Sequence, residues 1–344
     1  MYSMTCNSSF PSSLLADDTE SVMLFEENSL NELFNIMKNF EKISGLKVNS
    51  DKTEIMKIGK AKNYTQEFLP HYMFKWKTNI KTLGIELWND LSTTLSRNYT
   101  KKISTMKNVI NMWSQREVTM YGKILLTKTF ILSQFNFLVS CLPSPSEARI
   151  NEIDKMILQF VRSFKSAQKL SKEILQLDKS KGGLNLTLLK DQIIGLKISW
   201  VIRLFTDQNQ GWKDIVNKSL PLRNDDFWTC NIKKEDCKSI FSFCKNIPYF
   251  WKDVIIKWAS YNFHEPSNIS EILGQVLWFN SFIKNNKNEM VFYISCYNGN
   301  IKCVKDLLFQ NKIASFNEFT LLHPNVRIDF LKYFGLISMI PSRW

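Results

Sequence analysis

The sequence contains little glycine, proline or histidine, with 11 Gly, 9 Pro and 3 His among 344 residues. It has no internal repeat and no low-complexity tract, which excludes repeat and Pro-rich linker chains. Hydrophobic residues make up 44% of the chain and include 25 Phe and 10 Trp, so the chain is not intrinsically disordered. Scarce glycine and proline, beside abundant Asn, Lys, Ile and Leu, favour helices joined by polar loops.

Long hydrophobic runs are also missing. The most apolar stretch, Phe130 to Leu142, contains Ser, Gln and Asn and is too short to span a bilayer. The first residues show neither the basic region nor the long apolar segment of a secretory signal. No run of five Lys or Arg residues marks nuclear import. We therefore expect an intracellular protein, in the cytoplasm or the nucleus, with no membrane partner.

Cysteine occurs seven times, an odd number, without the close pairs typical of zinc sites. Five of the cysteines repeat at intervals of seven residues, which on a helix places them along one stripe. This spacing predicts buried, apolar thiols in a reducing compartment. We expect no zinc site from them with His264 or His323. The repeating cysteines are Cys230, Cys237 and Cys244, and Cys296 and Cys303.

Acidic residues are outnumbered by basic ones, 32 to 45, and the resulting charge of +13 is unevenly spread. The net charge is −3 over residues 1–60, +12 over residues 61–220 and +4 over residues 221–344. An acidic start followed by a strongly basic middle suits a metal site beside a track for a polyanion. The alternative is a generally basic protein without such a partner.

Two adjacent carboxylates, Asp17 and Asp18, lie between Leu14-Leu15 and the mostly apolar stretch Val22 to Phe25. The pattern predicts strand, tight turn and strand, because Asp tolerates the left-handed backbone of a two-residue hairpin. Paired carboxylates offer hard oxygen ligands to Mg²⁺, which neutralises phosphates in nucleotidyl transfer. The alternative is a solvated turn without a metal, since short motifs often occur by chance.

The rest of the first 90 residues predicts helices and strands in alternation. A capping box at Ser29 and Glu32 begins a helix, and Gly45 ends it in a left-handed conformation. Strands are expected at 46–49 and 53–58 around a turn at 50–51. A further pair is expected at 74–77 and 80–87, with Asn79 in its turn. This order predicts an α+β, palm-like layout.

From about residue 95 the apolar spacing becomes helical. We expect helices at 99–113, at 122–138, at 150–164 and at 188–205, the second of them apolar nearly all round and therefore buried. The polar stretch 206–225 predicts a linker, and a Trp- and Phe-rich region with helical spacing follows it.

Four short motifs follow one another in the first 90 residues. They are Leu15 to Thr19, Ser44 to Asn49, Lys52 to Glu54 and Leu83 to Ile85. Their order and spacing resemble the second half of the reverse transcriptase palm in the LINE-type, non-LTR retrotransposon branch. Weaker matches continue along nearly the whole chain. These are Trp113, Tyr121 to Ile124, Lys128, Pro143, Gly182 to Leu186, Trp200, Leu277 to Asn280, Asn298-Gly299 and Ile340 to Trp344.

The resemblance implies four segments. Residues 1–92 would form a partial palm of antiparallel strands plus a helix, in which the opening hairpin and the next forty residues share a sheet. Residues 93–205 would form a helical, basic, thumb-like domain. Residues 206–225 would be a linker, and residues 226–344 a helical, aromatic-rich C-terminal domain.

The resemblance also implies roles for individual residues. Asp17 and Asp18 match the catalytic, metal-binding carboxylates, with Mg²⁺ as the cofactor. Lys52 matches a catalytic lysine near the phosphates of the incoming dNTP. Leu83, Gly84 and Ile85 match the hairpin that grips the primer end. The basic helices match the thumb, which tracks an RNA/DNA template–primer. The lysines expected at the nucleic acid are Lys101, Lys102, Lys107, Lys123 and Lys128.

Several of these assignments have competing interpretations. Trp113 and Tyr121 can stack on bases, but their helical spacing favours packing in the core. Lys123 and Lys128 can contact phosphate or lie on a solvated helix face. The Gly182-Gly183 pair can approach a backbone closely or simply form a turn.

A working palm needs a further Asp on an earlier strand, and no acidic residue precedes Asp17 in this sequence. The fingers and an endonuclease module are also missing from it. We therefore expect a reverse transcriptase fragment that does not polymerise DNA alone. The alternatives are a non-catalytic nucleic-acid-binding remnant or a truncated gene model and, less in keeping with the palm motifs, a helical interaction scaffold.

Overall fold

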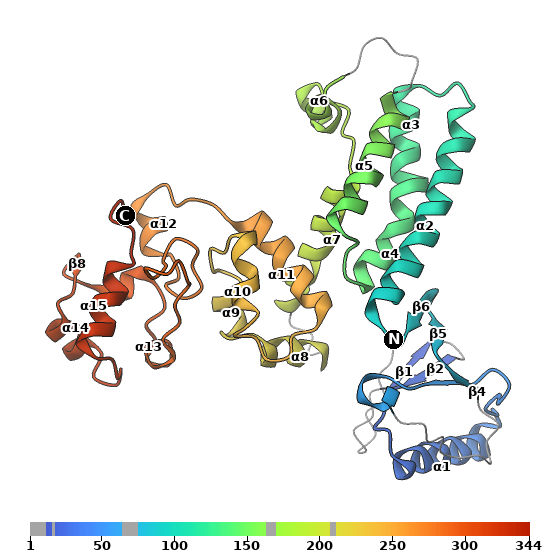
Figure 1. Cartoon of the computed structure of the whole chain (residues 1–344), viewed down its shortest axis with the longest axis horizontal. Helices are drawn as coiled ribbons and strands as arrows, with labels where there is room; N and C mark the ends of the chain where they lie inside the picture. Colours follow the sequence, from blue (N-terminus) through green and yellow to red (C-terminus); the bar gives the residue numbers. More distant parts are fainter. Residues whose placement is uncertain (1–11, 16–17, 64–74, 163–169, 207–210) are drawn as a thin grey trace. The chain divides into compact units, whose positions relative to one another are not determined.

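Helices and short paired strands make up the computed structural model, which describes residues 12–15, 18–63, 75–162, 170–206 and 211–344 (Figure 1). The chain divides into two units, Met1–Lys101 and Lys102–Trp344. Apart from the pair β7 (Leu308–Phe309) and β8 (Lys312–Ile313), the described strands belong to the first unit. The predicted α+β class is therefore confirmed.

The first unit opens with an antiparallel hairpin of β1 (Ser12–Leu15) and β2 (Asp18–Ser21), in which Leu15 lies opposite Asp18. An antiparallel strand pair at this point was predicted and is confirmed, while the turn at residues 16–17 lies outside the described residues. The second strand begins at Asp18, however, and precedes the apolar stretch Val22 to Phe25 that was expected to form it.

Helix α1 (Glu27–Ser44) follows and buries Leu30 and Phe34. Gly45 ends it at a φ of 71°, donating its N–H to the Glu41 carbonyl, as predicted. The predicted capping box is wrong, because the helix already begins at Glu27 and places Ser29 inside its first turn.

The expected strand at 46–49 is not formed. Instead, the Asn49 side chain accepts hydrogen bonds from the N–H groups of Asp51 and Lys52 and turns the chain at that point. Strand β3 (Glu54–Met56) then pairs in parallel with β4 (Lys75–Lys77), and the 3-10 helix η1 (Gly59–Asn63) lies between them in sequence. The two predicted hairpins, 46–49 with 53–58 and 74–77 with 80–87, were therefore wrong.

The hairpin of β5 (Asn79–Thr82) and β6 (Ile85–Trp88) turns at Leu83-Gly84 and not at Asn79. Leu83 has a φ of 48° and Gly84 a φ of 82°, so both turn residues are left-handed. Two left-handed residues define the tight turn whose twist matches paired strands. The three strand pairs of the first unit are separate two-stranded sheets, so its described strands do not form the single sheet expected of a palm.

Helix α2 (Leu91–Ser114) carries the predicted apolar seam, with Tyr99 and Met106 buried. A second long helix follows over Met120–Cys141, in place of the predicted 122–138. It consists of α3 (Met120–Leu126), a π-helical turn (Thr127–Leu132) and α4 (Ser133–Cys141). In the part of the chain that the structure describes, this is the one helix long and apolar enough to cross a membrane, although core helices pass the same test. The shorter stretch Phe130 to Leu142 had led us to expect none.

The π-helical turn aligns the two halves of this helix. Thr127 and Leu132 are both buried, Leu125 and Phe130 are both exposed, and the members of each pair are five residues apart. Five residues is the repeat of a π-helix, whereas an α-helix brings the same side round after three or four. One face therefore stays buried along the whole helix, and the opposite face exposes Tyr121, Leu125, Phe130 and Phe137. The prediction that this helix is buried on all sides was therefore wrong.

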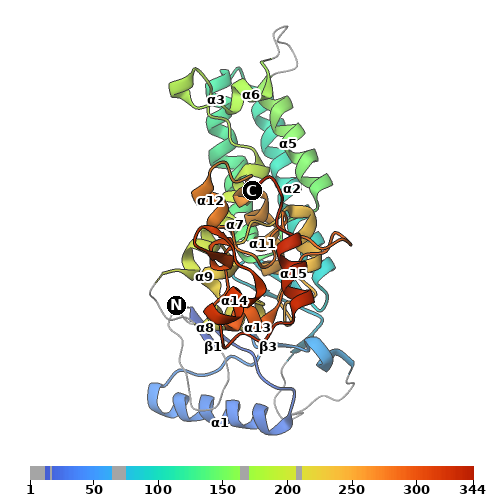
Figure 2. The ribbon, with the colours of Figure 1, turned by 90° about the vertical axis from the view of Figure 1, so that its left-hand side faces the viewer.

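Two further predicted helices are confirmed, as α5 (Glu147–Arg162) and α7 (Leu189–Leu204). Helix α3 packs beside α5, and α4 beside α7 (Figures 1 and 2). The remaining elements are α6 (Lys172–Gln176), η3 (Lys179–Lys181), α8 (Gly211–Ser219), α9 (Asn224–Phe227), η4 (Lys234–Asp236), α10 (Cys237–Ile240), α11 (Tyr249–Asn262), α12 (Ile269–Leu273), α13 (Ile294–Asn298), η5 (Val304–Leu307), α14 (Phe316–Leu322) and α15 (Phe330–Ser338).

The expected linker at 206–225 contains helix α8. Its Val216 is fully buried in the same hydrophobic cluster as Val201 of α7 and Ile255 of α11. The described part of this segment therefore belongs to a continuous core, and the second unit extends through it to the C-terminus.

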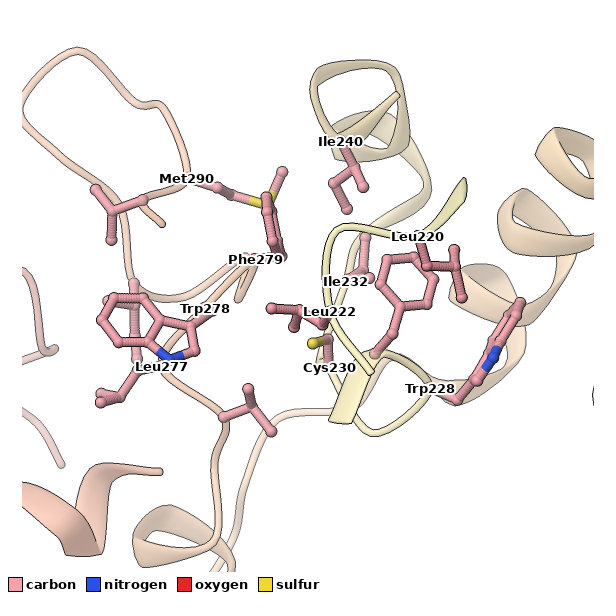
Figure 3. Packing of buried hydrophobic residues seen from close by; sticks show 14 of the residues in the cluster. Leu220, Leu222, Trp228, Cys230, Ile232, Ile240, Leu277, Trp278, Phe279 and Met290 are labelled. Carbon is pink, nitrogen blue, oxygen red and sulfur yellow. The ribbon is translucent and has the colours of Figure 1, made fainter. Parts of the chain in front are cut away.

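The tail motif Leu277 to Asn280 is completely buried at the centre of that core. Trp278 and Phe279 belong to the same hydrophobic cluster as Leu222 and Cys230 (Figure 3), and the Trp278 indole donates to the Ile301 carbonyl at 2.8 Å. Cys230, Cys237 and Cys296 are buried free thiols, as predicted, whereas Cys244 and Cys303 are half-buried. Burial raises the pKa of the Cys237 thiol to about 12, so it is inert near neutral pH.

An ion pair is buried where α4, α7 and α11 meet. Lys197 of α7 is fully buried, with its ammonium 3.3 Å from the Asp253 carboxylate and 2.8 Å from the Leu142 carbonyl oxygen. Asp253 also accepts hydrogen bonds from the backbone N–H and the hydroxyl of Ser144. Burial, only partly offset by Asp253, lowers the pKa of Lys197 to about 8. This network ties three helices together.

The Gly182-Gly183 pair forms a turn after η3. Gly182 is left-handed, at a φ of 80°. Gly183 lies against the chain at Leu177, where an added Cβ would be 2.0 Å from the carbonyl oxygen. The close approach considered from the sequence is therefore real, but it is made to this chain's own backbone.

Candidate nucleic-acid interface

The paired carboxylates are described only in part. Asp17 lies outside the described residues, and Asp18 is the first residue of β2, with its side chain outside them. Among the residues that the structure describes, no group of three His, Cys, Asp or Glu side chains could hold a metal ion. Lys52 is exposed in the turn formed by Asn49. The predicted Mg²⁺ site therefore remains a prediction.

The predicted primer-gripping residues lie together at the β5–β6 hairpin. Leu83 and Gly84 are exposed at its tip, and Ile85 is buried. The next helix, α2, begins three residues after β6. Asp90 accepts hydrogen bonds from the Thr93 N–H at 2.7 Å and from the Ser92 hydroxyl, and the Thr93 bond holds the pKa of Asp90 below its usual range. The hairpin therefore passes directly into a capped helix.

Two buried polar side chains of α2 hold the hairpin in place. The Asn98 amide accepts from the Glu86 N–H at 3.0 Å and donates to the Glu86 carbonyl at 2.7 Å. The Thr94 hydroxyl accepts from the Trp88 N–H at 2.9 Å. Because β6 satisfies these backbone groups with side chains of α2, the hairpin and the first turns of the helix are fixed to each other.

A shallow pocket of about 390 Å³ lies on this joint. Its lining consists of Glu86 from β6 and two pairs of α2 residues, each pair four residues apart and therefore on one side of the helix. The Lys101 ammonium lies 3.5 Å from the Glu86 carboxylate. The Arg97 guanidinium lies over the Trp88 ring, 5.4 Å from its centroid. The α2 residues of the lining are Ser96, Arg97, Thr100 and Lys101.

Of these residues, the sequence prediction included only Lys101. Glu86, Asn98 and Arg97 were missed. The one available signal was the i, i+4 repetition of a hydroxyl pair and a cation pair at the start of α2, just after the Leu83-Gly84-Ile85 motif. Two hydroxyls and two cations on one side of a helix suit contacts to phosphate oxygens.

The other predicted lysines lie in the second unit in different settings. Lys107 is exposed and pairs with Glu152 at 3.6 Å. Lys102 and Lys128 are half-buried. Lys123 is buried, 5.5 Å from the centroid of the Phe160 ring, which fits neither of its expected surface roles. Its aliphatic stem lies on the buried face of the helix, beside Ile124.

The two aromatic candidates also differ. Trp113 is half-buried, with the Arg116 guanidinium 4.7 Å from its ring centroid. Tyr121 is 61% exposed, so the preference for core packing was wrong at this position. Tyr121 belongs to the exposed apolar face of the helix Met120–Cys141. Because that segment is apolar nearly throughout, its sequence did not indicate which side of the helix is exposed.

No protein-family model matches this chain.

Proposed function

We propose that this chain is the C-terminal portion of a LINE-type RNA-directed DNA polymerase. We further propose that it binds the sugar–phosphate backbone of a template–primer. The observation that carries the proposal is the β5–β6 hairpin, with its left-handed Leu83-Gly84 turn, fixed onto the start of the long helix α2. This arrangement puts Arg97 over Trp88 and Lys101 beside Glu86, along the strand that leads away from the turn expected by resemblance to grip the primer end.

The chemistry asked of this surface is charge neutralisation. Each phosphate that a Lys or Arg neutralises releases condensed counterions, which gives affinity without sequence preference. Asp17 and Asp18 would hold Mg²⁺, which stabilises the attacking and leaving oxygens when it is bound. By resemblance, such a site also uses a carboxylate of an earlier palm strand.

We expect no template-dependent incorporation of dNTPs by the purified chain on a primed RNA template with Mg²⁺. The reason is that, by resemblance, Asp17 and Asp18 hold the metal ions together with a carboxylate of an earlier palm strand. The measurement is extension of a labelled primer, with Asp17→Asn as the matched variant. Extension that Asp17→Asn abolishes would show that the chain by itself has a working polymerase site at Asp17.

Binding of a short RNA/DNA duplex is expected to weaken steeply with salt. Lys101→Met should lower the slope of log K against log salt by about 1, as the loss of one phosphate contact does. The control is Lys312→Met, which removes an exposed lysine of β8 far along the chain. Fluorescence anisotropy at several salt concentrations measures both. Equal slopes for the two variants would mean that Lys101 contacts no phosphate.

A non-catalytic nucleic-acid-binding remnant is the second candidate. The observation in its favour is that the described strands of the first unit form three separate two-stranded sheets instead of one. Duplex binding that neither Mg²⁺ nor Asp17→Asn changes would favour this candidate, whereas Mg²⁺-dependent binding that Asp17→Asn weakens would favour the polymerase fragment.

A further inference from the structure

The pocket at the hairpin–helix joint contains one residue that does not suit a phosphate. Glu86 offers only acceptor oxygens when ionised and would repel an anion. Its carboxylate nevertheless lies beside Lys101 on the pocket wall, with 31% of its side chain exposed. A carboxylate next to a phosphate subsite is suited to accept a hydrogen bond from a hydroxyl close to that phosphate.

We propose that this pocket takes one ribonucleotide unit of an RNA strand, whose phosphate lies against α2 and whose 2′-hydroxyl donates to the Glu86 carboxylate. The inference rests on the proposed function and adds to it a preference for RNA over DNA. The 2′-hydroxyl is the group by which a protein distinguishes the two polymers at a given site.

The phosphate subsite is formed by α2. Arg97 and Lys101 supply charged donors, and Ser96 and Thr100 supply hydroxyls on the same side of the helix. The pocket, of about 390 Å³, is open to solvent, so a strand that lies along α2 can bring both its phosphate and its sugar to it.

The position of Glu86 is fixed before any ligand arrives. Asn98, itself only 6% exposed, binds both the N–H and the carbonyl of Glu86. The carboxylate therefore projects from a held backbone, which reduces the entropy lost on binding. A DNA strand brings no hydroxyl to this carboxylate and leaves its negative charge beside a phosphate, so Glu86 also acts against DNA.

The test compares 12-nucleotide single strands of one sequence as RNA, DNA and 2′-O-methyl RNA, by fluorescence anisotropy at one salt concentration. Wild type should bind RNA about three- to tenfold more tightly than DNA, the effect of one net hydrogen bond. The 2′-O-methyl strand has no donor and should bind like DNA. Glu86→Ala should reduce the ratio to about one and strengthen DNA binding, since a repulsive charge is removed.

Two variants separate charge from hydrogen bonding. Glu86→Gln keeps an acceptor and should retain a preference for RNA. Glu152→Ala is the matched control, because it also removes a carboxylate that pairs with an exposed lysine, but outside the pocket. It should leave the ratio unchanged.

The outcomes test the role of Glu86 and the proposed function separately. Binding with no preference for RNA, or a preference that Glu86→Ala retains, overturns the role of Glu86 and leaves the proposed function intact. Failure to bind any of the three strands or a duplex at low salt overturns the proposed function itself.

Discussion

Replacing Asp253 by alanine is expected to lower the free energy of unfolding by about 3–5 kcal/mol, as breaking a buried ion pair from one side does. The variant would leave the Lys197 ammonium fully buried with the Leu142 carbonyl and the face of the Phe250 ring, 3.9 Å away, around it. It would also remove the acceptor of two hydrogen bonds from Ser144. Urea denaturation followed by circular dichroism measures the loss.

The matched control is Glu265→Ala, which removes an exposed carboxylate that pairs with Arg343. Exposed pairs contribute about 0–1 kcal/mol, so this variant should unfold nearly like wild type. Lys197→Met keeps the volume and leaves the Asp253 carboxylate, which is 16% exposed and still accepts two hydrogen bonds from Ser144, so it should cost less than Asp253→Ala. A loss in Asp253→Ala no larger than in Glu265→Ala would mean that the ion pair does not hold these helices.

The pH dependence gives a second check on the same pair. Because the pKa of Lys197 is lowered to about 8 by folding, the unfolded chain binds more protons at this site between pH 8 and the ordinary lysine value. Stability from this group therefore rises with pH across that window. The difference in unfolding free energy between wild type and Lys197→Met should shift in favour of wild type as the pH rises above 8.

Replacing Gly183 by alanine is expected to lower the free energy of unfolding by about 1–3 kcal/mol, the usual cost of overpacking. The new Cβ would be 2.0 Å from the Leu177 carbonyl oxygen and 2.3 Å from its carbonyl carbon. Backbone atoms cannot move aside as a flexible side chain can, so the turn after η3 must shift. The measurement is again urea denaturation.

Gly195 provides the matched control for this substitution. It lies inside helix α7, and an added Cβ there would meet nothing within 4 Å. Gly195→Ala should therefore raise the stability by about 0.5–1 kcal/mol, through helix propensity. If the two alanine variants changed stability in the same direction, the close approach at Leu177 would not explain the glycine.

The helices were predictable where one apolar seam repeats over many residues. Tyr99 and Met106 of α2, and Ile153 and Ile157 of α5, are buried as their spacing indicates. Such seams are local, so sequence alone determines them. The left-handed cap at Gly45 was predictable for the same reason, since one residue type supplies it.

The strands were predictable only as pairs around short turns. The side chain of Asn49 turned the chain where a strand was expected, and β3 found a parallel partner some twenty residues later. Leu83 adopts a left-handed turn that its residue type disfavours, beside a glycine that tolerates it. Pairing over such distances depends on tertiary contacts that a local pattern does not contain.

The sequence predicted where the candidate site lies better than it predicted which residues form it. The Leu83-Gly84-Ile85 motif indicated the hairpin, but the roles of Asn98 and Glu86 depend on contacts between β6 and α2. At Lys123 the sequence prediction was wrong. Its charge suggested a surface residue, but the residue is buried, which its long aliphatic stem allows.

The π-helical turn at Thr127–Leu132 makes this helix one residue longer than a regular helix with the same two faces. Losing a single residue within the turn would convert it to ordinary α-helix and leave Tyr121 and Phe137 on their present side. Losing one elsewhere between Tyr121 and Phe137 would rotate the following part by about 100° and bring Phe137 toward the core. A related chain that differs here in length by one residue is therefore expected to have its gap at this turn.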